Sequence, residues 1–350
     1  MVKKTTNKMK KKKFDFKDVT IVPSPSSSIS SRKEIRILTD ENKLPLMVSP
    51  MDTVVDSQNY FKFLNKDMFV CLPRGESQVD EIFWSISLDD FDLMVTNEII
   101  KDSNTHMFIL VDIANGHIKK LHKLCEKFVK QNKKGRHTLM VGNVANPETY
   151  GILSEIGVDY VRVGIGGGSG CLTSANTGIH YPMASLINEC FKLKKINNYK
   201  TKIVADGGFK NYDDIIKALA LGADYIMLGG ILNKTLESCS KTKLFNIIPL
   251  NEVMSETIWY QYPFLRKYMY KNFRGMSTKE VQKKWGKLTL TTSEGISKNN
   301  KIEYTLSQWV DNFSDYLRSA MSYTDSKNLE EFRNSEIVFI SQNALKRFDK

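Results

Sequence analysis

The stretch KIVADGGFKNYDDIIKALALGADYIMLGG, residues 202–230, contains the pattern that decides the fold. Two short apolar runs, 202–208 and 225–230, flank a segment, 213–223, whose apolar residues recur with the period of a helix. Apolar strands joined by an amphipathic helix are typical of a parallel sheet whose faces are covered by helices. The stretch therefore predicts one strand–helix–strand unit.

The same unit recurs toward the N-terminus. We expect strands at residues 44–50, 68–72, 92–96, 106–113, 138–144, 160–165, 202–208 and 225–230. Between them, helical patterns cover residues 117–131, 147–157 and 183–195. Eight such units predict a closed (β/α)8 TIM barrel rather than an open sheet.

The remaining segments set the expected domain organisation. Residues 14–350 are predicted to form a single barrel domain, with an irregular insertion around 231–274 that is rich in lysine and aromatic residues. Residues 305–320 predict a last amphipathic helix. Residues 1–13 contain seven lysines and no acid, so we expect a basic disordered tail there.

Composition excludes several classes of protein. The tail lysines make up more than half of the net charge of +12, so the rest of the chain does not indicate a nucleic-acid partner. No apolar stretch is long enough for a membrane helix, and no apolar segment follows the N-terminal lysines as in a secretory signal. Five widely spaced cysteines argue against a disulfide framework and a Cys-rich zinc site. We therefore expect a cytoplasmic protein without a membrane partner.

Glycines and polar residues follow the predicted strands. They occur in VDIANG (111–116), GNV (142–144), GIGGGSGC (164–171), ADGG (205–208) and MLGG (227–230). Loops after the strands of such a barrel converge on its C-terminal face, where the active site lies. Because glycine lets backbone N–H groups approach an anion closely, these loops predict a phosphate-binding site on that face.

Cys171 is the candidate nucleophile. It lies in GIGGGSGCLTS (164–174), beside the hydroxyl residues Ser169 and Thr173. A thiolate on such a polar loop can attack an electrophilic carbon if its pKa is lowered locally. Cys125 and Cys190 lie inside helical patterns instead and are expected in the core. The residues alone leave a structural role for Cys171 open.

Several motifs in order carry a resemblance. They are SPMDTV (49–54), DIANGH (112–117), GNV (142–144), VGIGGGSGCLT (163–173), ADGG (205–208), KALALGADYIMLGG (217–230), RGMS (274–277) and SEG (293–295). With this set the chain resembles the IMP dehydrogenase/GMP reductase family, purine-nucleotide oxidoreductases on a (β/α)8 barrel. Dehydrogenases of the family usually carry paired CBS modules after the second strand. Residues 73–91 are too few for them, so no CBS insertion is expected.

Four details resemble GMP reductase more than the dehydrogenase. They are DIANGH, the sequence TGIHYP (177–182), the Gly-Gly end of MLGG, and the short stretch between Met276 and Glu294. That stretch lacks the Arg-Tyr flap that dehydrogenases use to activate water. The resemblance thus implies reductive deamination of GMP to IMP and ammonia with NADPH, through a thioimidate on Cys171.

The resemblance also implies roles for individual residues. Thr173 and Glu294 would be the catalytic proton-transfer pair beside Cys171. The purine nucleotide would contact Ser169, Asp206, Gly207, Gly208, Gly229, Gly230, Gly275, Met276, Ser277, Ser293 and Gly295. NADPH would contact Ser31, Arg32, Arg74, Asp112, Ile113, Ala114, Ile165 and Gly166. The family further implies a homotetramer in which a neighbour completes the cofactor site near residues 319–322.

Departures from the family pattern keep alternatives open. The family's potassium ion would lie at Gly166, Gly168 and Cys171, but Gly167 replaces a proline and Ser174 an arginine, which weighs against it. Thr291 also replaces an arginine of the reductases. A CBS-less IMP dehydrogenase that oxidises IMP with NAD⁺ to XMP is one alternative. A catalytically silent barrel that binds purine nucleotides is another.

Overall fold

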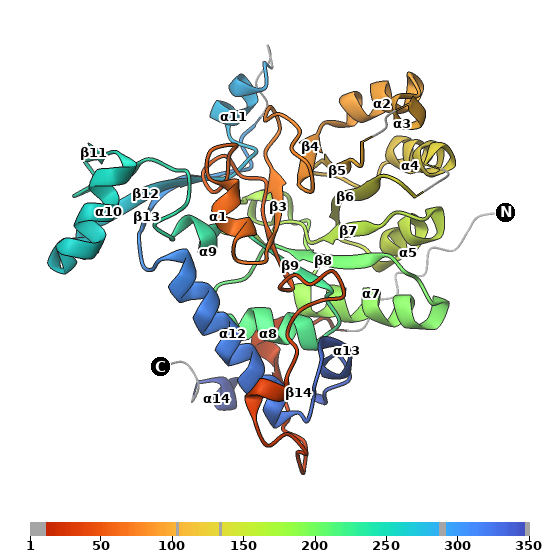
Figure 1. Ribbon diagram of the computed structural model, residues 1–350. Coiled ribbons are helices and arrows are strands. Elements are labelled where there is room, and N and C mark those ends of the chain that lie inside the picture. The colour runs from red at the N-terminus through yellow and green to blue at the C-terminus, as the bar shows by residue number, and fades with distance from the viewer. Residues whose placement is uncertain (1–11, 103–104, 133–134, 287–291, 347–350) are drawn as a thin grey trace.

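A parallel barrel forms the centre of the computed structural model, which describes residues 12–102, 105–132, 135–286 and 292–346. In this part of the chain eight parallel strands close on themselves, with β9 pairing back to β2 (Figure 1). The strands are β2 (Leu46–Val48), β3 (Phe69–Leu72), β4 (Phe83–Ile86), β5 (Phe108–Asp112), β6 (Thr138–Val144), β7 (Tyr160–Val163), β8 (Lys202–Asp206) and β9 (Tyr225–Leu228). The predicted (β/α)8 barrel is confirmed.

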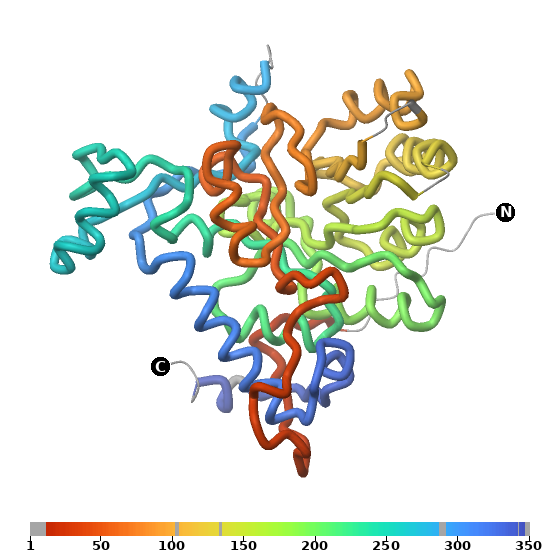
Figure 2. Tube along the Cα trace, viewed as in Figure 1, coloured from red at the N-terminus to blue at the C-terminus, as the bar shows by residue number. Residues whose placement is uncertain are grey.

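Helices surround the barrel, as the Cα trace shows (Figure 2). Those between or after the strands are α1 (Tyr60–Leu64), α2 (Leu88–Thr96), α3 (Ile99–Asp102), α4 (Lys119–Gln131), α5 (Pro147–Ile156), α6 (Thr173–Thr177), α7 (Met183–Asn197), α8 (Tyr212–Ala220), α9 (Gly230–Asn233) and α12 (Leu306–Tyr323). In α4 the buried residues Leu121, Leu124, Cys125 and Phe128 recur at helical spacing. They form the apolar stripe that packs the helix on the barrel.

The prediction of a third strand at residues 92–96 was wrong. Residues 92–96 belong to α2, and the strand is β4, which the pattern missed. Ser87 starts α2 with a capping box: its Oγ accepts from the backbone N of Asp90 at 3.1 Å, and the Asp90 carboxylate accepts from the Ser87 backbone N. Residues 73–82, all of which are described, join β3 to β4 through turns, so nothing resembling a CBS insertion lies between them.

An apolar cluster fills the barrel below its C-terminal face. Its buried members are Met47, Phe69, Cys71, Phe83, Leu110, Met140, Tyr160, Val204, Tyr225 and Met227. Side chains alternate along a strand, so a residue two positions further on points the same way. This places a second, mostly polar layer above the apolar one, made of Ser49, Asp112, Gly142, Arg162, Asp206 and Gly229. The floor of the site is therefore set by strand alternation.

An irregular insertion was expected around 231–274, but this segment consists of regular strands and helices. It contains β10 (Thr242–Leu244), β11 (Ile248–Leu250), α10 (Glu252–Gln261), η3 (Pro263–Tyr268) and β12 (Met269–Arg274). With β13 (Ser297–Lys301) these strands form a four-stranded antiparallel sheet in the described residues, ordered β11-β10-β12-β13, beside the barrel (Figure 1). Its own core consists of Leu236, Leu250, Trp259, Met269 and Ile302.

A buried lysine interrupts the alternation of apolar and polar residues by which β12 could have been recognised in the sequence. Met269, Lys271 and Phe273 point inward on β12. The Lys271 Nζ donates to the backbone oxygens of Leu236, at 2.7 Å, and of Ser238. Burial lowers the pKa of Lys271 to about 8. A lysine at an inward position breaks the apolar–polar pattern by which strands are recognised in a sequence.

The two ends of the described chain meet beneath the barrel. β1 (Val19–Ile21), after η1 (Phe16–Asp18), pairs antiparallel with β14 (Ile337–Phe339), which lies between α13 (Leu329–Phe332) and α14 (Gln342–Leu345). Lys13 forms an ion pair with Glu189. The predicted disordered tail falls largely on residues 1–11, which lie outside the described residues, and it stays a prediction. Among the described helices, none has the length and apolarity needed to cross a membrane.

Candidate active site

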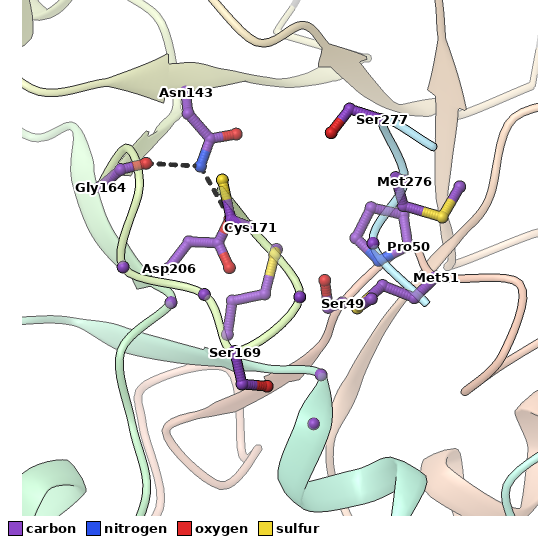
Figure 3. A pocket seen from close by; sticks show the side chains of 18 of the residues that line it. Ser49, Pro50, Met51, Asn143, Gly164, Ser169, Cys171, Asp206, Met276 and Ser277 are labelled. Carbon is purple, nitrogen blue, oxygen red and sulfur yellow. Dashed lines mark hydrogen bonds between the residues drawn. The ribbon is translucent and has the colours of Figure 1, made fainter. Parts of the chain in front are cut away.

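A cavity of about 290 Å³ opens at the C-terminal ends of the barrel strands (Figure 3). Cys171 and Asp206 lie on one side of it, facing Pro50, Met276 and Ser277 on the other. Most of the predicted site residues line it, namely Cys171, Thr173, Glu294, Ser169, Asp206, Gly207, Gly208, Gly229, Gly230, Gly275, Met276, Ser277, Arg74, Asp112, Ile113, Ala114, Ile165, Gly166 and Gly168. The structure thus gathers residues from distant parts of the chain into one site.

A chain of hydrogen bonds connects the thiol to a carboxylate. The Cys171 Sγ donates to the Thr173 Oγ1 at 3.2 Å, and the Thr173 Oγ1 donates to the Glu294 Oε2 at 2.5 Å. This arrangement resembles the nucleophile, base and orienting group of other covalent catalysts. A proton can therefore pass between the thiol and the carboxylate through the threonine hydroxyl.

Backbone pairing holds Glu294 on the cysteine loop. The Leu172 N donates to the Glu294 carbonyl oxygen at 2.6 Å, and the Ile296 N donates to the Gly170 carbonyl oxygen at 3.1 Å. Between these bonds Cys171 and Gly295 form an isolated antiparallel bridge. The carboxylate, which follows the cysteine by more than a hundred residues in the chain, is fixed beside it by this local ladder.

The other cysteines are placed differently. Cys71, Cys125 and Cys190 are fully buried, which confirms the core position predicted for the last two. Burial raises the pKa of all three thiols and of Cys239, that of Cys125 and Cys239 to about 12. These thiols stay protonated near neutral pH. Among the cysteines only Cys171 lines the cavity.

The predicted phosphate loops meet at one end of the cavity. A side chain at Gly230 would place its Cβ 2.6 Å from the Ser169 Oγ, so only glycine leaves that hydroxyl its place. Gly207 has a φ of +90° and approaches the backbone of Gly168. Ser169 and these glycines form an uncharged rim of hydroxyl and backbone groups, which suits an anion.

Four predicted residues do not line the cavity. Ser293 and Gly295 form a local turn around Glu294, in which the Ser293 Oγ donates to the Gly295 carbonyl oxygen at 2.8 Å. Ser31 and Arg32 begin η2 (Arg32–Glu34), where the Ser31 Oγ accepts from the Lys33 N. η2 packs against α12, so within one chain these two residues do not reach the cavity. Thr291 lies outside the described residues.

Two of the carbonyl oxygens predicted to bind potassium accept hydrogen bonds within the cysteine loop. The Gly166 carbonyl oxygen accepts from the Ser174 Oγ at 2.9 Å, and the Gly168 carbonyl oxygen accepts from the Cys171 N at 2.9 Å. Two of the three predicted carbonyl ligands thus already serve as acceptors within the loop. Ser174, which replaces the family's arginine, occupies one of them. We derive no step through a cation.

Among the cavity-lining residues that the sequence analysis assigned to no site are Asn143, Arg162 and Trp285. Asn143 donates from its Nδ2 to the Gly164 carbonyl oxygen at 2.9 Å and to the Asp206 Oδ2 at 2.7 Å (Figure 3). Arg162 bonds Asp112 and Asp206. The Trp285 ring stacks on the Arg74 guanidinium, whose Cζ lies 4.6 Å from the ring centroid. Asn143 lay in a quoted motif and Arg162 was a charge within an apolar strand, whereas nothing in the sequence marked Trp285.

An ion network holds the helix next to Trp285. The Asp52 Oδ2 accepts from the Arg274 Nη2 at 2.6 Å and from the Lys284 Nζ at 3.1 Å. Burial alone would raise the pKa of Asp52, but these two cations hold it below its ordinary value. Lys284 is the last residue of α11 (Lys279–Lys284), so the network fixes α11 against the loop after β2.

His117 connects the loops after β5 and β6. The Ala145 N donates to its Nε2 at 3.0 Å, so the neutral ring carries its proton on Nδ1, which lies 2.8 Å from the Thr149 Oγ1. Burial lowers the pKa of His117 below its ordinary value of 6.5. The unfolded chain therefore binds the proton first, and stability present above pH 6.5 is lost as the pH falls through the lowered value.

We expect the His117→Gln variant to lose less stability than the wild-type protein on acidification from about pH 7 to about pH 5, because glutamine does not titrate. Melting temperatures of both proteins across this range check the prediction. The exposed His106→Gln variant is the matched control and should follow the wild type. Parallel melting curves for His117→Gln and the wild type would contradict the assignment.

Known proteins resemble this chain over most of its length. A model of the IMP dehydrogenase / GMP reductase domain matches residues 97–348. GMP reductase 1 of Mus musculus is 33% identical over 245 residues, which cover 63% of this chain and 69% of that protein. GMP reductase of Buchnera aphidicola is 28% identical over 348 residues, 91% of each chain. GMP reductase 2 of Homo sapiens is 27% identical over 357 residues, 94% of this chain and 95% of that protein.

Proposed function

Since the chain belongs to the IMP dehydrogenase/GMP reductase family, we propose that it is a GMP reductase that converts GMP and NADPH to IMP, ammonia and NADP⁺. The observation that carries the proposal is the hydrogen-bonded chain from Cys171 through Thr173 to Glu294 inside the cavity. A protein that only binds nucleotides needs neither a nucleophile nor a proton path beside it.

The nucleotide would lie with its phosphate at the glycine rim and its base beside Cys171. Ser169, Gly207, Gly208, Gly229 and Gly230 would hold the phosphate, and Asp206 would accept hydrogen bonds from the ribose hydroxyls. Gly275, Met276 and Ser277, across the cavity from Cys171, would lie along the nucleotide. This pose orients carbon 2 of the purine toward the thiol.

The reaction would proceed in two stages at carbon 2. The Cys171 sulfur adds to this carbon, and its proton passes through Thr173 to Glu294. The pair then protonates the amino group, which leaves as ammonia and gives a thioimidate between Cys171 and the purine. Hydride addition at carbon 2 and cleavage of the carbon–sulfur bond release IMP and the thiolate. Dividing one difficult displacement into easier steps is the advantage of covalent catalysis.

The residues present fit a nicotinamide dinucleotide beside the nucleotide. Asp112, Ile113, Ala114, Ile165 and Gly166 line the cavity and would hold it. Arg74 also lines it, and its guanidinium, whose Nε lies 3.7 Å from the Asp112 Oδ2, would donate from its other nitrogens to an anionic group of NADPH. When bound, the dinucleotide supplies the hydride. Asp112 and Trp285 orient Arg74 from either side.

A homotetramer would complete the cofactor site. Ser31 and Arg32 on η2 and residues 319–322 on α12 belong to two elements that pack against each other. We propose that this surface meets the dinucleotide bound by a neighbouring subunit, which is why Ser31 and Arg32 lie away from the cavity of their own chain. Sedimentation analysis should give a tetramer, and a monomer active at the lowest concentration tested would contradict the arrangement.

One assay tests the proposed function. The protein is mixed with GMP and NADPH, and in parallel with IMP and NAD⁺, and the near-ultraviolet absorbance of the reduced cofactor is followed. We expect this absorbance to fall in the first mixture and to stay constant in the second. A rise in the second, with no change in the first, would identify an IMP dehydrogenase. No change in either would favour a silent binding protein.

The Asp206→Ala variant tests the nucleotide pose. Loss of a hydrogen bond to a charged group costs about 1.5–3 kcal/mol, so the KM for GMP should rise roughly 10–150-fold, and that for NADPH far less. Initial rates with each substrate varied separately measure both constants. Asp213→Ala, an exposed carboxylate on α8, is the control. Equal effects on both KM values would contradict the proposed contact between Asp206 and the ribose of GMP.

A further inference from the structure

Arg162 connects the two ligand regions of the cavity. Its Nη1 donates to the Asp112 Oδ1 at 2.6 Å and its Nη2 donates to the Asp206 Oδ2 at 2.7 Å. Asp112 ends β5, in the proposed dinucleotide region, and Asp206 ends β8, in the proposed nucleotide region. One guanidinium on β7 therefore joins two carboxylates from separate strands, each in the region proposed for a different ligand.

The barrel is built to hold this side chain. Arg162 is only 5% exposed and stands directly above the apolar cluster, as an inward residue two positions after Tyr160. On the neighbouring strand a Cβ at Gly142 would lie 2.5 Å from the Arg162 Cβ, so glycine there makes the room. Among the described residues the buried Arg162 Nε has no hydrogen-bond partner. The side-chain hydrogen bonds of Arg162 therefore go to the two carboxylates.

Burying a lone guanidinium is costly, so the arginine and its two acids depend on one another. Asp206 and Asp112 raise the pKa of Arg162 although burial opposes its charge. Without the arginine, Asp206 would keep the hydrogen bond from the Asn143 amide, and Asp112 would keep only the longer contact with the Arg74 Nε at 3.7 Å. The rigid planar fork of arginine can bond both at once, whereas a lysine ammonium is a point charge that cannot reproduce this geometry.

We propose that Arg162 is a positioning residue that couples nucleotide binding to dinucleotide binding. The inference rests on the proposed function only for the identity of the two ligands. A ligand that bonds Asp206 orders this carboxylate, and the fork transmits the order to Asp112. The second ligand then meets a carboxylate that is already fixed, so it binds more tightly. By thermodynamic reciprocity each ligand must strengthen the other by the same factor.

Calorimetric titration measures this coupling without turnover. GMP and NADP⁺ form a pair that cannot react, since the oxidised cofactor has no hydride to give. In the wild-type protein we expect each ligand to tighten the other at least about fivefold. In Arg162→Ala both affinities should fall at least about tenfold, with the coupling lost. Arg162→Lys should recover part of both affinities but not the coupling.

Two controls separate positioning from folding. Arg333→Ala removes a comparable ion pair, to the 4%-exposed Asp224 far from the cavity, and should leave both affinities and their coupling unchanged. Guanidinium ion at low concentration should partly restore the affinities of Arg162→Ala, whereas sodium ion should not. If Arg162→Ala does not fold, Arg162→Lys decides the question alone.

The outcomes separate this inference from the proposed function. Arg162 variants that retain both affinities and the coupling, or that weaken the binding of only one ligand, would overturn the coupling role while leaving GMP reduction standing. A wild-type protein that oxidises IMP but does not reduce GMP would overturn the proposed function. The same titration with IMP and NADH, which also cannot react, would then decide the role of Arg162.

Discussion

Cys171→Ala is expected to abolish turnover of GMP while GMP affinity stays within roughly tenfold of the wild type. The alanine removes the sulfur that bonds carbon 2 in the proposed mechanism, so no thioimidate would form. The proposed phosphate and ribose contacts at Ser169 and Asp206, which would supply most of the ground-state affinity, remain in place. Steady-state rates and calorimetric titration with GMP measure the two quantities.

The matched control is Cys125→Ala. This thiol is buried in α4, far from the cavity, and its removal should leave the rate unchanged. Residual turnover of Cys171→Ala at more than a few per cent of the wild-type rate would show that the cysteine is not the nucleophile. A loss of GMP binding as large as the loss of rate would instead indicate a collapsed loop.

Glu294→Gln is expected to lower kcat by about 10²–10⁴-fold, the usual contribution of general acid–base catalysis. The amide has the shape of the carboxylate and can still accept the hydrogen bond from Thr173, but it cannot take or give the proton that the leaving amino group requires. The KM for GMP should change little because the backbone pairing of residues 294–296 persists. Initial-rate kinetics measure both constants.

The comparison variant is Glu303→Gln. Glu303 follows Glu294 by nine residues, and its exposed carboxylate lies 2.9 Å from the Lys234 Nζ. Loss of this carboxylate should leave kcat near the wild-type value. Thr173→Val should reproduce most of the Glu294→Gln effect, because it interrupts the same proton path. A Glu294→Gln variant with wild-type kcat would mean that another group protonates the departing nitrogen.

The barrel was predictable because apolar strands and amphipathic helices alternate along the chain. Residues 92–96 were misassigned because the apolar run within them, residues 93–95, is too short to show a period of its own. The capping box of Ser87 and Asp90, which is local sequence information, would have identified the helix. The extra sheet was missed for a different reason: Lys271 buries its charge against backbone carbonyls, which only the folded chain brings near it.

Some residues of the site could likewise be predicted from the sequence, and others could not. The cysteine loop and the strand-end glycines were predictable, since each is a continuous motif. Arg162 was also within reach, because strand alternation places it two residues above the buried Tyr160. Trp285 was not, since its contact with Arg74 depends on where α11 docks. The positions of Ser31 and Arg32 away from the cavity likewise follow from tertiary packing of η2 on α12.

Product analysis after an acid quench tests the central claim most directly. The wild-type protein is incubated with GMP and NADPH, stopped during turnover, and examined for small molecules and for modified peptides. The account predicts IMP, ammonia and NADP⁺ in equal amounts, together with a purine adduct on the peptide that contains Cys171. Formation of XMP from IMP and NAD⁺, with no IMP from GMP, would contradict it.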